Sequence, residues 1–453
     1  MAIVLFGFIC ALLMFGFPVA LTLAGVSLIV AFIASMFGGF DMALLHAFPS
    51  RLFGIINNQT LLAVPLFVMM GVTLEKAGIA QALLNSMAQL FGRFRAGLGF
   101  SVVFVGMLLA ASTGIVGATV VTMGLMSLPS MLKRGYHPAI ASGSICATGT
   151  LGQIIPPSIA LVLLGDVLSS SYQKAQLDMG IFSPKTVSVG DLFAGALIPG
   201  LLLVAMYFGY LLLMSKLKPT WFGKATEAPS KVDITALVNS LVPPMVLIIL
   251  VLGSILLGVA TPTEAAAVGA CGALVLALIK GQLNVSGLQN IGLETVKVTS
   301  MVFLILIGAS LFSLVFRGLG GEELIEGVFQ QLPGGAVGAM ILVMLVIFLL
   351  GFILDFIEIT FVVVPIVAPV LMMMGIDPLW LGIMLAVNLQ TSFLTPPFGF
   401  SLFYLRGVAP KSLHTSDIYK GVIPFIGIQV LLLIMLALWP ELVTWLPEQV
   451  YGK

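Results

Sequence analysis

The stretch GTLGQIIPPS at residues 149–158 has a counterpart, NLQTSFLTPP, at residues 388–397. Each places a Pro-Pro pair behind polar residues within an otherwise apolar run. A proline lacks a backbone N–H, and its ring clashes with the carbonyl four residues earlier, so it interrupts a helix. The two stretches therefore predict two Pro-broken helices. They also predict that the carbonyls of residues 152, 153, 392 and 393 are freed from helical hydrogen bonds.

The two stretches belong to a longer internal repeat. At a constant offset of 240 residues, every proline between 111 and 168 finds a proline partner. The pairs are Pro129 with Pro369, Pro138 with Pro378, Pro156 with Pro396 and Pro157 with Pro397. Coincidence is the alternative in a chain with 49 Gly and 24 Pro, but an offset that stays constant without gaps favours duplication. Internal repeats of this kind are typical of secondary transporters.

Each repeat begins with a long apolar segment, at residues 98–131 and 336–373, and continues into a Pro-broken segment, at 138–170 and 379–408. As one helix, 98–131 would be about 50 Å long, against a hydrocarbon core of about 30 Å. Its flanks are both basic, which places both ends on the cytoplasmic side. The counterpart has acidic flanks, which places its ends outside. Two re-entrant helical hairpins in repeats of inverted topology follow.

Composition sets the class of the protein. Hydrophobic residues make up 60% of the chain and charged residues 8%, far fewer than in soluble domains. We expect about a dozen membrane-embedded segments, and thus an all-α polytopic membrane protein. The lysine-rich residues 215–235 form a cytoplasmic linker between a first half, 1–214, and a second half, 236–453. A net charge of +1 excludes nucleic acid as a partner.

Candidate binding residues cluster at the first hairpin tip, at the two breaks and in the second hairpin. Small and hydroxyl residues can line a cavity at membrane depth, although a close helix-packing seam is the alternative for the first tip. Backbone carbonyls and hydroxyls suit an alkali cation, and matched breaks in inverted repeats favour paired ion and substrate sites. The candidates are Ser112, Thr113, Gly114, Gly149, Thr150, Pro156, Asp355, Asn388, Thr391, Ser392 and Thr395.

Acidic residues are rare within the apolar segments. Asp355 and Glu358 lie inside the second hairpin, where a charge is costly, so each is a functional candidate or a buried structural acid. Glu264 follows Thr261 and Pro262, a pattern typical of a capped helix start. We therefore assign Glu264 a structural role.

Enzymatic function is not indicated. The chain has no GxxxxGK[ST] phosphate loop and no HExxH motif, and its three histidines fall in expected loops. His137 is interpreted as part of a polar turn. The three cysteines are far apart in apolar surroundings, which indicates neither a disulfide framework nor a metal site. No cofactor is expected.

The chain resembles the large membrane subunit of tripartite ATP-independent periplasmic (TRAP) transporters. The resemblance covers nearly the whole chain and rests on several stretches together. These are LLAVPLF (61–67), the 111–119 tip, GYHP (135–138), IIPPS (154–158), ATPTEAAA (260–267) and the Asp355 hairpin.

The resemblance implies an elevator-type ion transporter fold and sodium-coupled uptake of an organic acid such as a dicarboxylate. It implies a small four-helix membrane subunit, a periplasmic substrate-binding protein and a place in the bacterial inner membrane. It also implies sodium at Ser112, Gly114, Gly149 and Pro156, and at Asp355, Thr391 and Thr395. The alternatives are a sodium- or proton-coupled carboxylate carrier that needs no binding protein, and an ion channel. Residues 169–188 are expected to form a long external loop. This loop is either a contact site for a binding protein or a solvated insertion.

Overall fold

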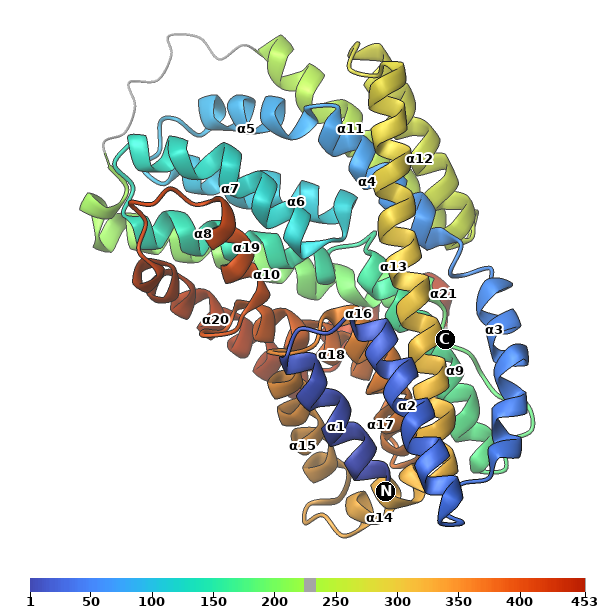
Figure 1. The fold of residues 1–453 in the computed structure, drawn as a ribbon. Helices are drawn as coiled ribbons and strands as arrows, with labels where there is room; N and C mark the ends of the chain where they lie inside the picture. Colours follow the sequence, from blue (N-terminus) through green and yellow to red (C-terminus); the bar gives the residue numbers. More distant parts are fainter. Residues whose placement is uncertain (224–233, 453) are drawn as a thin grey trace.

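A computed structural model describes residues 1–223 and 234–452, without the side chains of Thr113 and Ala236. The described chain is built from helices, which confirms the all-α prediction (Figure 1). Seven of these helices are long and apolar enough to cross a membrane, or nine if each of two bent helix pairs is one span. The remaining apolar helices are shorter, so several of the dozen expected segments do not span on their own.

One set of helices packs on the long α13, either directly or through α4 and its neighbours, and α13 runs along most of the molecule in Figure 1. We call this set the α13 group. It consists of α1 (Ala2–Met14), α2 (Val19–Met36), the 3-10 helix η1 (Met42–Ala47), α3 (Phe48–Ile56), α4 (Ala63–Lys76), α5 (Ile79–Leu90), α11 (Ile234–Leu256), α12 (Pro262–Ile279), α13 (Val285–Gly318) and α14 (Gly321–Gln330). The cap predicted for α12 is present, because Thr261 and Glu264 form a reciprocal capping box.

The remaining helices form the two repeats. The first contains α6 (Gly97–Thr113), α7 (Val116–Lys133), α8 (Pro138–Thr150), the 3-10 helix η2 (Leu151–Gln153), α9 (Ile159–Asp178) and α10 (Val189–Leu217), followed by the 3-10 helix η3 (Pro219–Trp221). The second contains α15 (Gly335–Leu350), α16 (Phe356–Val362), α17 (Val364–Met373), α18 (Pro378–Leu394), α19 (Phe400–Val408) and α20 (Thr415–Leu438), followed by α21 (Glu441–Tyr451). Both hairpins and both breaks predicted from the sequence are confirmed.

The helices before the breaks, α8 and α18, form the core of the repeats and are buried on almost every face. Helix α8 packs along α20, and small residues allow the backbones to touch. A Cβ atom added to Gly143 would collide with the carbonyl of Gly421, and one added to Gly421 would collide with that of Ala139. This close contact fixes α8 of the first repeat against α20, near the end of the second repeat.

The turn between α7 and α8 contacts the start of the linker. His137 accepts a hydrogen bond from the backbone of Ala139 through Nδ1, which confirms its place in a polar turn, and its ring stacks on Trp221 at 4.4 Å. The His137 backbone N–H donates to the Trp221 carbonyl at 2.7 Å. Most of the predicted linker, residues 224–233, lies outside the described residues.

The expected long loop at 169–188 is shorter than predicted. Residues 169–178 continue α9, and only the following ten residues leave the helix. The Gln176 side chain holds this loop, since it donates to the Lys185 carbonyl and accepts from the Lys185 backbone N–H. Tyr172, Lys174 and Asp178 thus lie in the outer turns of α9, whereas Lys185 lies in the loop.

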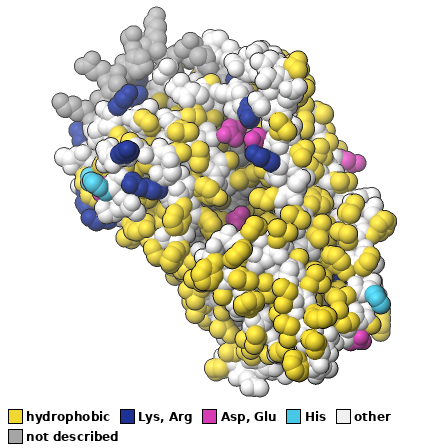
Figure 2. Space-filling view, in the orientation of Figure 1, with side chains coloured by type: hydrophobic (Ala, Val, Ile, Leu, Met, Phe, Trp, Pro, Cys, Tyr) yellow, Lys and Arg dark blue, Asp and Glu magenta, His cyan; other side chains and the backbone are white. Residues whose placement is uncertain are grey.

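Charge is unevenly distributed along the molecule. On the face drawn in Figure 2, Lys and Arg side chains gather near the uncertain residues 224–233, and apolar side chains cover most of the opposite end. Because basic residues favour the cytoplasmic side, the linker end is expected to face the cytoplasm.

Thiol labelling tests this orientation. Lys133→Cys and Met374→Cys are introduced after the three native cysteines are replaced by serine. In intact cells, an impermeant maleimide should label position 374 and leave position 133 unlabelled until the membrane is permeabilised. Equal labelling of the two positions in intact cells would contradict the inverted topology.

Candidate functional site

The tips of the two hairpins meet at a cavity of about 110 Å³, which we call the central cavity. Gly114 lies at the first tip and Asp355 at the second, and both line it. The full lining is Gly114, Ile115, Val116, Gly117, Gln153, Ile159, Ala160, Leu163, Val298, Met301, Val302, Asp355, Phe356, Ile357, Phe393 and Tyr404. Residues of both repeats and of helix α13 thus line the cavity.

Two long helices begin at this cavity. Val116 is the first residue of α7 and Ile159 the first of α9, and both line the cavity. Neither helix has a side-chain cap on its first backbone N–H groups. Such N–H groups carry partial positive charge and can donate hydrogen bonds to an anion. None of the described lining residues is Lys or Arg, so the helix starts are the positive features of this site.

Asp355 and Glu358 form a capping box at the start of α16. The Asp355 carboxylate accepts from the Phe356 N–H at 2.7 Å, and Glu358 Oε2 accepts from the Asp355 N–H at 2.9 Å. Glu358 is buried, and this contact gives it the structural role that the sequence left open. Asp355 has a structural role as well, but it also lines the central cavity.

Packing brings the first tip against the first break. A Cβ atom added to Gly114 would lie 3.0 Å from the backbone nitrogen of Ile159, directly after the break. Gly149 packs so closely on Val120 of α7 that a Cβ there would collide. Of the predicted residues in this repeat, Gly114 reaches the central cavity and Gly149 acts as a close-packing contact.

The first arm of the second hairpin, α15, is tied to α18 by hydrogen bonds. Asn388 Nδ2 donates to the Met344 carbonyl at 2.8 Å, and Ser392 Oγ donates to that of Phe348 at 2.8 Å. Gly351, at the tip, packs against the Ser392 side chain. Asn388 and Ser392 therefore anchor α18 to α15 instead of lining the cavity.

The predicted hydroxyls donate to carbonyls within their own helices. Thr391 Oγ1 donates to Val387 at 2.8 Å, Thr395 Oγ1 to Thr391 at 2.7 Å and Thr150 Oγ1 to Ala147 at 2.9 Å. A hydroxyl that donates in this way keeps its lone pairs for a cation. Ser112 donates to Leu109, and with Leu83 and Ile248 it lines a smaller gap toward α5 and α11, away from the central cavity. The Thr113 side chain lies outside the described residues.

The carbonyls freed by the prolines are less open than the sequence predicts. Ser158 Oγ donates to the Gly152 carbonyl at 2.7 Å, and Ser401 Oγ donates to that of Phe393 at 2.9 Å. The Ser392 carbonyl accepts from the Thr395 N–H at 3.0 Å. In each repeat a serine beyond the break thus replaces a lost helical donor. Each carbonyl keeps a second lone pair, so the breaks still offer acceptors for an ion.

Two polar side chains in the cavity lining were not predicted from the sequence. Gln153 is 2% exposed, and neither polar atom of its amide has a hydrogen-bond partner among the described residues. Tyr404 packs against Gly117 at the first tip. Gln153 lies between Gly152 and two isoleucines in the stretch quoted above. A single amide in an apolar run was the sequence feature that could have indicated a site residue. Tyr404 carried no such signal, because its position depends on how α19 folds back onto α7.

A buried polar cluster joins three helices behind the breaks. Gln429 Nε2 on α20 donates to Tyr207 Oη on α10 at 2.8 Å and lies 3.4 Å from Thr150 Oγ1 on α8. Tyr207 and Gln429 are fully buried. This contact gives Thr150 a place in the core of the repeats, one turn away from the first break.

Comparisons with known proteins agree with this architecture. The family described as tripartite ATP-independent periplasmic transporter, DctM component, matches residues 6–442. A C4-dicarboxylate TRAP transporter large permease protein from Vibrio cholerae is 29% identical over 87% of each chain. A sialic acid TRAP transporter large permease protein from the same species is 29% identical over 89% of each chain.

A third relative and one solved structure are also similar to the chain. An ectoine/5-hydroxyectoine TRAP transporter large permease protein from Ruegeria pomeroyi is 26% identical over 96% of this chain and 98% of its own. The YdaH transporter of Alcanivorax borkumensis has the same fold, with a TM-score of 0.62 at 15% identity over 96% of this chain and 98% of that one. The chain belongs to the DctM family of TRAP transporters, as a large, membrane-embedded permease subunit and not an enzyme.

Proposed function

We propose that this subunit imports an organic acid, coupled to sodium, across the bacterial inner membrane. The observation that carries the proposal is the central cavity, where two hairpin tips from inverted repeats meet two uncapped helix starts. Inverted-repeat carriers place substrate and ions at such an interface, with helix N-termini directed at an anionic group. The uncapped N–H groups at Val116 and Ile159 would bind the substrate's acid group.

Sodium suits the oxygens at the breaks. Backbone carbonyls and threonine hydroxyls supply dipoles without charge, and the described residues contain no group of three or more His, Cys, Asp and Glu that could hold a metal ion. A monovalent cation can bind to such uncharged oxygens. In this proposal the ion travels with the substrate, held at the tips and breaks by residues such as Gly114, Asp355, Thr391 and Thr395.

The proposed transport mechanism is an elevator. The central cavity lies between the repeats and α13, since Val298, Met301 and Val302 complete its wall. If the repeats move as a unit along the α13 group, the cavity changes its exposure from one side of the membrane to the other. Helix α13 then serves as the fixed wall against which the site slides.

The proposed substrate class rests on chemistry shared by the substrates of the three relatives described above. Their names give C4-dicarboxylate, sialic acid and ectoine, all of which carry a carboxylate. A carboxylate fits a site whose donors are backbone N–H groups. We propose a carboxylate substrate, delivered by a periplasmic binding protein and moved together with a small membrane subunit.

Dependence on the binding protein is the first test. The chain is reconstituted in vesicles with its small subunit, and uptake of the binding protein's radiolabelled ligand is measured with an inward sodium gradient. Uptake should stay near background until the binding protein is added. Full uptake without it would favour the alternative carrier that works alone, and an inhibitor-sensitive current at channel rates would favour a pore.

A further inference from the structure

A second and larger cavity lies between the α13 group and the repeats, and we call it the outer cavity. Its volume is about 470 Å³. Three basic side chains reach it from three helices: Arg51 from α3, Lys174 from α9 and Arg317 from α13. Ser170, Ser310 and Ser313 add hydroxyls to its wall. The cavity is thus polar and basic, unlike the central cavity.

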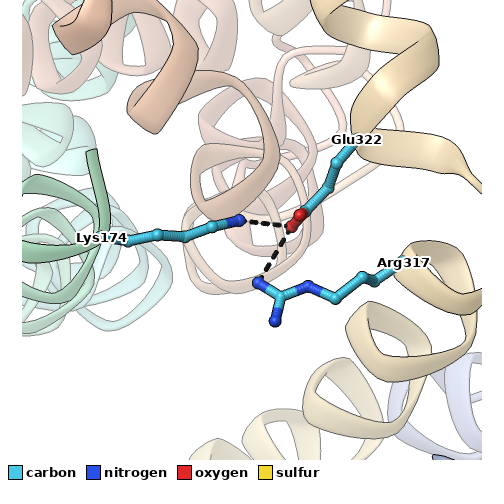
Figure 3. A network of polar contacts seen from close by, with 3 residues as sticks. All are labelled: Lys174, Arg317 and Glu322. Carbon is cyan, nitrogen blue, oxygen red and sulfur yellow. Dashed lines mark hydrogen bonds and ion pairs between the residues drawn. The ribbon is translucent and has the colours of Figure 1, made fainter. Parts of the chain in front are cut away.

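One acid neutralises part of this charge. Glu322 Oε1, at the start of α14, accepts from Lys174 Nζ at 2.6 Å and pairs with an Arg317 guanidinium nitrogen at 3.2 Å (Figure 3). Partial burial alone would raise the pKa of Glu322, but Lys174 and Arg317 hold it below its ordinary value. Glu322 is therefore ionised at neutral pH.

Positive charge remains after these contacts. The lining contains three cations and two carboxylates, Asp166 and Glu322, which leaves one positive charge in excess. Asp166 accepts a hydrogen bond from the Asn58 amide at 2.9 Å. Arg51 makes no ion pair within 4.0 Å in the part of the chain that the structure describes. The guanidinium of Arg51 is thus free to bind an anion.

The outer cavity continues the seam that forms the central cavity. Along α9 the central cavity ends at Leu163 and the outer cavity begins at Asp166. Along α13 the corresponding residues are Val302 and Leu306. These steps are three and four residues, about one helical turn. An anion in the outer cavity would therefore lie next to the site where transport is proposed.

In the predicted topology this cavity faces outside, where basic residues are rare in membrane proteins. A purely structural role would need only the pair between Lys174 and Glu322. It would not need a third cation or a cavity of this volume.

We propose that the outer cavity is a receiving site for the substrate's carboxylate, which binds Arg51 and Arg317 before it enters the central cavity. This inference rests on the proposed uptake of an organic acid. Glu322 acts as an internal anion that occupies Arg317 while the site is empty, and an incoming carboxylate displaces it. Because Lys174 lies on the repeats and Glu322 on the α13 group, the same displacement weakens an ion pair between the two groups.

Charge-selective thiol labelling tests the site without any uptake measurement. Ser313→Cys is introduced into a chain whose native cysteines are serine, and the purified protein is treated with an anionic or a cationic methanethiosulfonate reagent. The ratio of the two labelling rates, relative to free mercaptoethanol, reports the local potential. The anionic reagent should be favoured on the order of tenfold.

Substitutions should shift the charge preference of labelling in directions that a purely structural ion pair would not produce. Arg51→Gln should remove most of the anionic preference, and Glu322→Gln should increase it. Lys216→Gln, an exposed charge at the linker end, is the matched control and should change nothing. Succinate should slow labelling saturably, whereas glycerol should not. Equal rates for the two reagents, or labelling that succinate does not slow, would overturn the proposal.

Lipid composition separates a soluble acid from a lipid headgroup. Succinate should protect equally in vesicles of phosphatidylcholine and in vesicles that also contain phosphatidylglycerol. Protection lost only with the anionic lipid would assign the cavity to a headgroup and overturn the substrate assignment. Since labelling needs neither sodium nor the binding protein, a failed uptake assay with intact protection would count against the proposed function alone.

Discussion

Uptake is expected to stop in sodium-free buffer, and Thr391→Ala is expected to raise the sodium concentration for half-maximal uptake by roughly 5-fold to over 100-fold. The Thr391 hydroxyl donates to Val387 and keeps its lone pairs for an ion. Losing such a ligand costs about 1 to 3 kcal/mol, the range for an unmet buried polar contact. Because 1.4 kcal/mol corresponds to a tenfold change in affinity, this cost gives the expected range of the sodium concentration for half-maximal uptake. Uptake in vesicles at graded sodium concentrations provides the measurement.

Thr22→Ala is the matched control, because Thr22 makes the same kind of bond, to the Pro18 carbonyl at 2.9 Å, on α2. It should leave sodium dependence unchanged. Ser112→Ala should have a smaller effect than Thr391→Ala, since Ser112 faces α5 and α11. Glu358→Gln should preserve sodium dependence, because glutamine can replace glutamate in a capping box.

Proton coupling would give the opposite pattern. Uptake that persists without sodium, follows an imposed pH gradient and disappears in Asp355→Asn would show that the coupling ion is the proton. Asparagine is a good helix N-cap, so this variant removes the charge of Asp355 while the start of α16 stays capped.

Gln153→Leu is expected to weaken substrate binding and to stabilise the empty protein. The amide of Gln153 is buried in the central cavity without a partner among the described residues, and leaving such a group unpaired costs about 1 to 3 kcal/mol. Leucine removes that cost in the empty state, so the melting temperature without substrate should rise. A substrate hydrogen bond is lost at the same time, so the KM for uptake should increase roughly 5-fold to over 100-fold.

Gln390→Leu is the matched control for this variant. Gln390 is a fully buried glutamine on α18 and is not among the described residues that line the central cavity. Its replacement should leave the KM unchanged. If Gln153→Leu raises the melting temperature but leaves the KM at the wild-type value, the amide has no part in substrate binding.

The fold could be predicted because proline and charge leave strong local signals. Pro156 and Pro396 must interrupt their helices wherever those helices pack, and Lys133 and Arg134 orient a turn regardless of tertiary contacts. The constant offset between the repeats then related one half to the other. These features are properties of the chain itself, so one sequence sufficed to predict the hairpins and the breaks.

The site was predicted less completely, because ligand positions depend on which way a side chain points. Ser112 was grouped with Gly114, yet a helical turn directs Ser112 toward α5 while Gly114 faces the cavity. The carbonyl freed by Pro156 is covered by Ser158, which the spacing did not indicate. Residues on α13 were missed entirely, since Met301 and Val302 look like any apolar residue in a span.

Charge fixed in the described lining of the central cavity, where Asp355 is the one carboxylate, has no net electrical effect over a proposed transport cycle. In the proposed elevator, the fixed charge of Asp355 would cross the membrane field in both directions during a full cycle, so its contribution would cancel. The net charge moved per cycle therefore equals the sum of the charges of the coupling ions and of the substrate. Two sodium ions with a dicarboxylate would be silent, and a third would carry inward current driven by about 2.3 kcal/mol per 100 mV. A voltage-clamp recording would thus count the coupling ions directly.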